Sequence, residues 1–143
     1  HPGRRIDVET TGDAACTCDA QRLAQAISNL LGNALRHGAP DEPVVVRVDT
    51  AGADAIAVSV HNRGTPIPAA TRESLFEPLV RGAQAPHGGY NLGLGLYVVR
   101  EIAAAHGGSA SVESDAGSGT TFTIRLPRDA SAASSAFPGL RMN

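Results

Sequence analysis

Apolar positions along the chain follow two different periods, which predict two kinds of secondary structure. Over residues 19–37 they recur at steps of three and four, the spacing of a buried stripe on a long helix. The stripe comprises Leu23, Ile27, Leu30, Leu31 and Ala34. Asp19 can cap the start of this helix, and Gly38, with prolines beyond it, can end it.

A second stripe with the same spacing predicts a helix over 94–106. Its members are Leu96, Val99, Ile102 and Ala103. Gly107 and Gly108 follow as a stop signal. Residues 68–75 predict a short helix, with Pro66 just before it and Pro68 at its start. Residues 79–92 show no period and carry several glycines, which indicates a loop, and a loop of this length in a compact domain is commonly functional.

Elsewhere apolar and polar residues alternate, as they do in strands with one covered face. Strands are predicted over 6–9, 14–18, 44–50, 55–60, 109–114 and 120–126. The strands over 44–50 and 55–60 should form one hairpin, and those over 109–114 and 120–126 a second. Helices mixed with hairpins favour an α/β fold, a two-layer α/β sandwich in which helices pack on one face of a mixed, mostly antiparallel sheet.

Length, charge and cysteine content narrow the class of protein. The 143 residues suit one domain with its own core, expected over 1–127, before a disordered tail or linker over 128–143. The net charge of −2 gives no case for nucleic acid or an anionic membrane as a partner. No apolar run approaches the roughly 20 residues of a membrane span, and we expect a cytoplasmic location. Cys16 and Cys18 lack the further ligands that a metal site needs.

Four separated segments carry polar residues and glycines in patterns suited to nucleotide chemistry. They are NLLGNALRH at 29–37, NRGTPI at 62–67, GLGL at 93–96 and GSGTT at 117–121. Asn33 offers a neutral oxygen that suits Mg²⁺, and Arg36 can fork onto phosphate. Glycines that open a helix leave free N–H groups for an anion. Each segment alone also fits an ordinary solvated helix face, turn or loop-to-helix junction.

Together and in this order, the segments resemble the nucleotide-binding boxes of sensor histidine kinases of the GHKL superfamily. The resemblance implies the Bergerat fold, ATP and Mg²⁺ as cofactors, and donation of the γ-phosphate to a histidine. None of the chain's five histidines lies in an acceptor pattern. The acceptor is therefore expected on a dimerisation domain of the same parent chain, with a response regulator as the next partner in two-component signalling.

The resemblance also implies roles for individual residues. Asn33, Arg36 and Arg81 would be catalytic, with Asn33 as the Mg²⁺ ligand and the arginines at the phosphates. The residues implied in nucleotide binding are Asn29, Asn33, Arg36, His37, Asn62, Gly64, Ile67, Phe76, Gly93, Leu94, Gly95, Leu96 and Thr120. Asn29 stands where hydrolysing relatives such as DNA gyrase keep a glutamate. Because an amide cannot act as a general base, phosphoryl transfer is expected rather than hydrolysis.

The second segment departs from the family pattern at two positions. Asn62 replaces an aspartate that accepts a hydrogen bond from the adenine amino group, and Pro66 replaces a glycine. Asn62 keeps an acceptor oxygen but lacks the charge that strengthens such a bond. His61 and Asn62 together are similar to a variant found in kinases of the bacteriophytochrome type.

Two alternatives accompany the histidine kinase interpretation. The first is a nucleotide-binding pseudokinase or regulatory module, which the departures at Asn62 and Pro66 favour. The second is a serine kinase of the anti-sigma-factor type, which shares the fold. Phe76 and the long loop over 79–92, which would serve as a lid on the nucleotide, favour the histidine kinase.

Overall fold

The computed structural model describes residues 4–12, 17–50, 54–72, 74–78 and 92–129. In this part of the chain, five strands form one sheet in the order β1-β2-β3-β5-β4. Their bounds are Ile6–Thr11 (β1), Val44–Thr50 (β2), Ala55–Asn62 (β3), Ser109–Asp115 (β4) and Gly119–Pro127 (β5). β1 runs parallel to β2, and every other neighbouring pair is antiparallel. The prediction of a mixed, mostly antiparallel sheet is confirmed.

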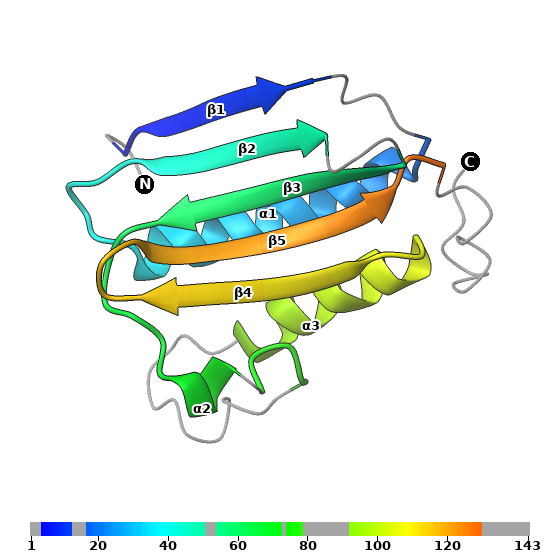
Figure 1. The fold of residues 1–143 in the computed structure, drawn as a ribbon. Helices are drawn as coiled ribbons and strands as arrows, with labels where there is room; N and C mark the ends of the chain where they lie inside the picture. The colour runs from blue at the N-terminus through cyan, green and yellow to red at the C-terminus, as the bar shows by residue number, and fades with distance from the viewer. Residues whose placement is uncertain (1–3, 13–16, 51–53, 73, 79–91, 130–143) are drawn as a thin grey trace.

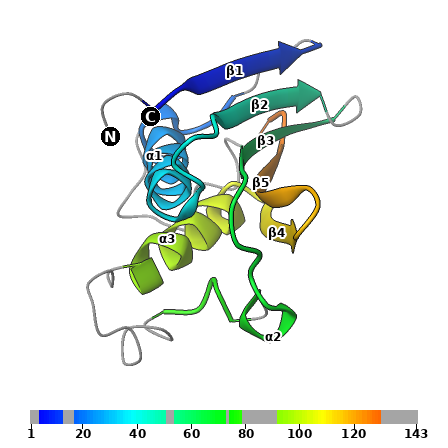
Figure 2. The same ribbon diagram turned by 90° about the vertical axis from the view of Figure 1, so that its left-hand side faces the viewer.

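The two long helices lie on one face of this sheet (Figure 1). They are α1 (Ala20–His37) and α3 (Leu92–Ala105), and the short α2 (Ala69–Arg72) lies near the end of the sheet where β3 ends. The view along the layers separates the helices from the sheet (Figure 2). α1 packs against β2 and β3, and α3 against β4 and β5. The predicted two-layer α/β sandwich is therefore confirmed.

α1 begins after Asp19 and ends before Gly38, as the sequence predicted. The Asp19 carboxylate accepts a hydrogen bond from the backbone N–H of Arg22 at 3.1 Å, which satisfies one free donor of the first turn. The Gly38 N–H donates to the Ala34 carbonyl at 2.8 Å. The buried line of the helix is narrower than predicted, because Leu23 and Leu31 only flank the core while Leu30 and the small alanines lie fully inside it.

The core fills the space between the helices and the sheet. Its largest fully buried side chains are Phe122, Leu30, Ile124, Leu126, Val44, Val60 and Val99. Full burial of one such apolar side chain contributes about 1.5–3 kcal/mol. Along β3, buried residues alternate with less buried ones. This alternation turns Asn62, the last residue of β3, toward the helical side of the sheet.

Two helices differ in extent from the prediction. α3 spans Leu92–Ala105 where 94–106 was predicted, so that the whole GLGL segment lies in its first turns. α2 covers only Ala69–Arg72 of the predicted 68–75, and turns follow it up to Pro78. Of the predicted loop over 79–92, residues 79–91 lie outside the described residues.

The ends of the domain also differ. Of the strand predicted over 14–18, Thr17 makes an isolated parallel bridge with Asp129, and residues 14–16 lie outside the described part. The N–H of Arg128 donates to the Asp54 carbonyl at 2.8 Å. Arg128 and Asp129 are thus joined to the fold, although the sequence placed them in the tail.

His106 joins the end of α3 to the start of α1. Its side chain is only 2% exposed. Nε2 accepts a hydrogen bond from the backbone N–H of Asp19 at 3.0 Å, and Nδ1 lies 2.8 Å from the Ile102 carbonyl oxygen. Because a carbonyl can only accept, the ring is neutral with its hydrogen on Nδ1.

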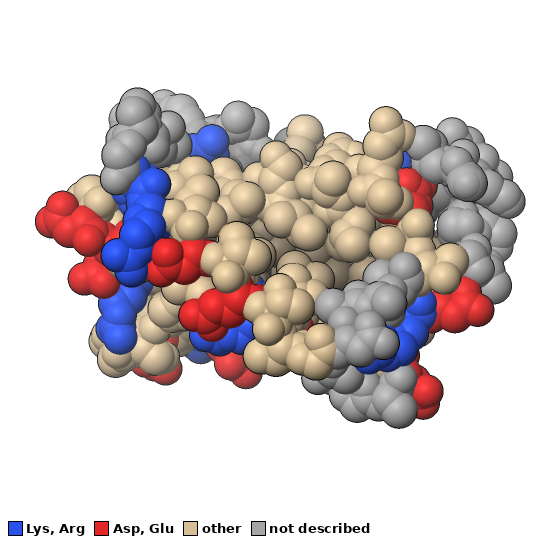
Figure 3. All heavy atoms as spheres, turned by 90° about the horizontal axis from the view of Figure 1, so that it is seen from above, with Lys and Arg blue, Asp and Glu red and all other residues tan. Residues whose placement is uncertain are grey.

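The face above β1 shows basic and acidic side chains next to one another (Figure 3). Arg5 pairs with Asp7 at 3.0 Å, and Arg47 with Glu9 at 2.8 Å. Such solvent-exposed pairs contribute little to stability, because water and salt screen them. None of the helices in the described part of the chain combines the length and the hydropathy that a membrane span requires.

Candidate functional site

A cavity of about 430 Å³ opens where α1 and β3 end and β5 begins. Its lining residues are Asn33, Arg36, His37, Asn62, Thr65, Pro66, Ile67, Pro68, Thr71, Leu75, Leu96, Thr120 and Phe122. The structure thus brings together seven of the residues singled out in the sequence: Asn33, Arg36, His37, Asn62, Ile67, Leu96 and Thr120. No described residue that lines the cavity carries a carboxylate. The lining therefore combines neutral polar groups, apolar surface, the imidazole of His37 and the guanidinium of Arg36.

The last turn of α1 supplies one wall of the cavity. Asn33 lies one helical turn before Arg36 and His37, so their side chains share a face. Asn33 is 9% exposed, whereas Arg36 and His37 are exposed. Within the described part of the chain, the side chains of Asn33 and Arg36 have no hydrogen-bond or ion-pair partner. An amide oxygen and a guanidinium free at a cavity wall fit Mg²⁺ and phosphate oxygens respectively.

Asn29 does not line this cavity, although the sequence implied a nucleotide contact. Its amide Nδ2 donates to the backbone carbonyl of Gly95 at 3.1 Å. The contact joins the middle of α1 to the first turn of α3. It needs a donor at position 29, because a carboxylate would set two acceptors against each other.

The end of β3 supplies a second part of the cavity wall. Asn62 is 5% exposed and stands directly opposite Thr120 of β5 in the antiparallel ladder. Two glycines make room for it: a Cβ on Gly38 would lie 3.0 Å from the Asn62 Cβ, and one on Gly119 only 2.4 Å from its backbone oxygen. Gly119 also has φ of +96°, which favours glycine.

Gly64 likewise serves close packing and does not line the cavity. A Cβ there would lie 3.1 Å from the His37 carbonyl oxygen and 3.2 Å from the Ala39 nitrogen. The N–H of Ala39 also donates to the Arg63 carbonyl at 2.6 Å. The glycine therefore lets the segment after β3 lie against the end of α1.

Ser114 organises the polar groups around Thr120, although no motif in the sequence marks it. The two hydroxyl oxygens are 2.7 Å apart. The Ser114 Oγ also accepts from the backbone N–H of Ile67 at 2.9 Å. Arg72 donates to the carbonyls of both Ile67 and Ser114, at 2.9 and 2.7 Å. The strand register, which pairs Ser114 with Thr120, is the signal that could have identified it.

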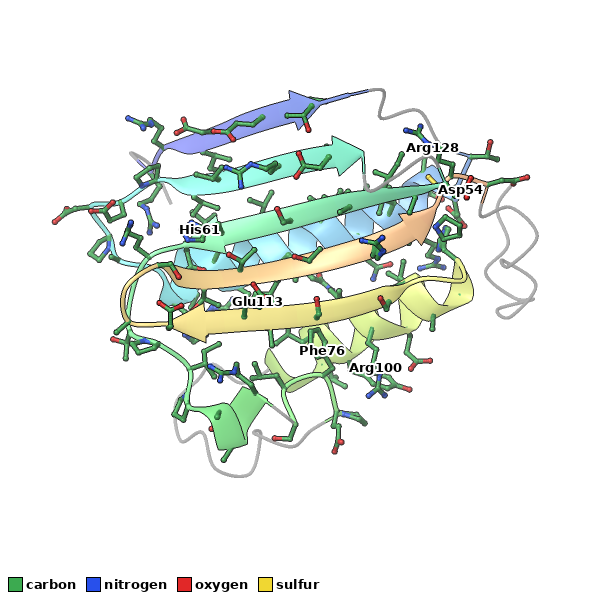
Figure 4. The ribbon with its side chains drawn as sticks, viewed as in Figure 1. Asp54, His61, Phe76, Arg100, Glu113 and Arg128 are labelled. Atoms are coloured by element: carbon green, nitrogen blue, oxygen red, sulfur yellow. The ribbon has the colours of Figure 1, made fainter. Side chains whose placement is uncertain are left out.

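The turn between β4 and β5 is held onto the end of β3. Asp115 accepts hydrogen bonds from Ser118 N–H, Ser118 Oγ and Gly117 N–H. The Ser118 bonds, foremost, hold the pKa of Asp115 below its usual range. His61 Nε2 lies 2.6 Å from the Ser118 carbonyl oxygen, and Arg63 donates to the Gly117 carbonyl at 3.0 Å. Figure 4 shows His61 at this end of β3.

Four further described residues implied by the resemblance are not among the lining residues of the cavity. Phe76 meets Phe122, a lining residue, edge to face with 6.0 Å between ring centroids, and it lies beneath β4 near α3 (Figure 4). Leu94 is 47% exposed. Gly95 accepts the Asn29 bond, and Gly93 belongs to the first turn of α3. Arg81 lies outside the described residues.

The remaining lining residues were not predicted as site residues. Thr65, Pro66 and Pro68 follow β3, Thr71 and Leu75 come from α2 and the turns after it, and Phe122 belongs to β5. The prolines of this segment fix backbone φ and give it an apolar surface. The proline at 66, noted in the sequence as a departure, thus forms part of the wall.

Comparisons with known proteins agree with this architecture. Residues 18–130 match the family model described as "Histidine kinase-, DNA gyrase B-, and HSP90-like ATPase". The chain is 35% identical to sensor protein CzcS of Cupriavidus metallidurans over 134 residues, which is 92% of this chain and 28% of CzcS. It is 36% identical to a bacteriophytochrome of Pseudomonas aeruginosa over 130 residues, covering 89% of this chain and 17% of that protein. It therefore spans about a quarter or less of these relatives.

Solved structures show the same fold. The catalytic domain of histidine kinase ThkA is 26% identical with a TM-score of 0.73, covering 88% of this chain and 79% of that one. The mycobacterial sensor histidine kinase MprB is 28% identical with a TM-score of 0.72, covering 86% and 82%. The match of the family model over most of the chain and the shared fold lead to one conclusion: this chain belongs to the family of histidine kinase-, DNA gyrase B- and HSP90-like ATPases, among the sensor histidine kinases.

Proposed function

We propose that this domain binds Mg·ATP in the cavity and donates the γ-phosphate to a histidine on a dimerisation domain of its parent chain. A response regulator would then receive the phosphoryl group in two-component signalling, and the domain would act in the cytoplasm. The observation that carries the proposal is the meeting of Asn62 and Thr120 with Asn33 and Arg36 around one cavity. Family membership supports it.

The two ends of the cavity suit the two ends of the nucleotide. At the buried end, Asn62 can accept a hydrogen bond from the adenine amino group, with Thr120 and Ser114 as neighbouring hydroxyls. Ile67, Leu96 and Phe122 offer apolar contact to the base. At the open end, Arg36 and His37 can hold the phosphates. Mg²⁺ bound at Asn33 would offset phosphate charge, and positioning supplies most of the catalysis in such transfers.

Transfer is favoured over hydrolysis by the chemistry of the lining. Hydrolysing relatives activate water with a carboxylate, and the described lining residues include none. Position 29, where hydrolysing relatives keep a glutamate, holds an amide engaged with Gly95. The γ-phosphate would therefore wait for the acceptor histidine.

Incubation with γ-labelled ATP tests this function. The chain alone should neither retain label nor release phosphate appreciably. Addition of a separate, histidine-bearing dimerisation domain should produce acid-labile label on that domain. Label on a serine of an added acceptor would instead assign the chain to the anti-sigma-factor type of kinase.

A pseudokinase or regulatory nucleotide-binding module is the second candidate, because Asn62 and Pro66 replace family residues at the base-binding end. The same experiment separates it from a kinase. Calorimetric binding of Mg·ATP without transfer to any supplied acceptor domain would establish the regulatory module. Absence of nucleotide binding would contradict both functions.

A further inference from the structure

The polar side chain at the buried end of the cavity is the carboxamide of Asn62, and its chemistry decides which purine bases the cavity can bind. We propose that the site accepts 6-oxopurine nucleoside triphosphates, such as ITP and GTP, as well as ATP, because Asn62 can read either base edge. The inference rests on the proposed function, since it assumes that the purine lies at Asn62. It concerns the substrate class of that same cavity.

The hydrogen-bonding edges of the two purine classes are opposite. Adenine presents an amino donor at C6 and an acceptor at N1, whereas a 6-oxopurine presents an acceptor at C6 and a donor at N1. A carboxylate can only accept, so it pairs with the adenine amino group and repels the oxygen of a 6-oxopurine. A carboxamide has both an acceptor oxygen and a donor NH₂. Rotation by half a turn exchanges them, so that Asn62 can match either edge.

The surroundings of Asn62 leave this rotation open. Its only intramolecular side-chain bond in the described structure is from Nδ2 to the Arg63 carbonyl, and it is long at 3.3 Å. Gly38 and Gly119 pack against the Cβ side and the backbone of Asn62. These contacts fix the position of the Cβ atom and leave the terminal amide group free to rotate. The cost of reversing the amide is therefore the loss of one weak bond.

The hydroxyl groups at the buried end of the cavity can also either donate or accept a hydrogen bond. Thr120 and Ser114 are hydroxyls 2.7 Å apart, and either can be the donor. No carboxylate occurs among the described lining residues to exclude a 6-oxo group. Arg36 and Asn33 face the phosphate end and contribute equally to all purine triphosphates. Nothing in the described cavity thus selects adenine by charge.

Titration of the chain with Mg·ATP, Mg·ITP and Mg·GTP tests the inference. ITP is the decisive ligand, because it carries the 6-oxo edge without the extra 2-amino group of guanine. We expect the affinities for ATP and ITP to lie within about tenfold of each other, since the amide makes a comparable pair with each base. Asn62→Asp should keep ATP binding and weaken ITP binding about ten- to hundredfold, because a bidentate base contact discriminates by this amount.

Ser59→Asp is the matched control. Ser59 lies on the same strand but on the uncovered face of the sheet, opposite Arg47 in the register. The substitution therefore adds the same negative charge outside the cavity. Its ratio of ATP to ITP affinity should equal that of the parent chain. Because each ratio is measured within one preparation, a partly folded variant does not distort it.

The outcomes separate this inference from the proposed function. If ATP binds and ITP binds more than about a hundredfold more weakly in the parent chain, the site selects adenine and the inference is wrong while the function stands. An unchanged ratio in Asn62→Asp would show that Asn62 does not read the base. Failure of every nucleotide to bind would overturn the proposed function itself.

Discussion

The amide of Asn29 donates to the carbonyl of Gly95, and this 3.1 Å contact connects the asparagine-rich face of α1 with the first turn of α3. The two segments are the first and third of the motif segments in the sequence. Their junction explains why position 29 holds a side chain with an N–H group. A carboxylic acid in the ionised state could not make this contact.

Replacement of Asn29 by Asp should lower the free energy of unfolding by about 1–3 kcal/mol, the cost of leaving a partly buried acceptor without its donor. Urea unfolding measures the change. Ser28→Asp, one residue earlier on the exposed face of α1, adds the same charge to the helix and serves as the control. Equal stability of the two variants would show that the bond to Gly95 contributes nothing.

Replacement of Asn33 by Ala should remove the benefit that Mg²⁺ gives to ATP binding. The amide of Asn33 lies at the cavity wall and has no hydrogen-bond partner among the described residues, so we expect the fold to persist while Mg·ATP affinity falls at least about tenfold. Calorimetric titration of parent and variant with ATP, with Mg²⁺ or with EDTA, measures the effect. An undiminished difference between Mg²⁺ and EDTA in the variant would remove Asn33 from the metal site.

The stability contributed by Asp115 should depend on pH. The bonds from Ser118 and Gly117 lower the pKa of its carboxyl in the folded chain, so this stability is complete above the unfolded pKa of about 4 and is lost as the pH falls through the lower, folded value. Asp115→Asn should therefore unfold at lower urea than the parent at pH 7. The difference should shrink at pH 3. Asp41→Asn, at an exposed position, controls for the loss of one charge, and a gap that grows in acid would contradict the assignment.

Replacement of His106 by Ala should lower the free energy of unfolding by about 2–4 kcal/mol, because it empties a buried site and leaves the Asp19 N–H without its acceptor. Urea unfolding again gives the value. His106→Phe keeps a ring of similar size without either nitrogen, and it separates packing from hydrogen bonding. If the Phe variant matches the parent, the bonds to Asp19 and Ile102 are not stabilising.

The sequence predicted the long elements well because they carry strong local signals. α1 combines an apolar stripe with Asp19 and Gly38 at its ends, and both boundaries are confirmed. The alternation along β3 predicted its strand, and the structure extends it by two residues to Asn62. Periodicity and capping depend on neighbouring residues alone, so they can be read without the fold.

The site was predictable only where a motif marked it. Asn33, Arg36 and Asn62 belong to segments with recognisable spacing, and all line the cavity. Ser114 does not, because its role depends on the register of β4 against β5. Asn29 and Gly64 also belong to these segments, but they do not line the cavity, because they contact Gly95 and the end of α1 respectively. Their contact with the nucleotide stays a prediction.

The cavity wall is drawn from α1, from the segment after β3, from α3 and from β5, which lie far apart along the chain. The wall exists only once the final hairpin has joined the sheet, so the proposed nucleotide would bind the completed fold and no partial version of it. Ligand binding should then act on the whole domain as one cooperative unit, raising the melting temperature progressively with nucleotide concentration. Nucleotide in the cell would in this way stabilise the folded state of the domain as well as donate phosphate.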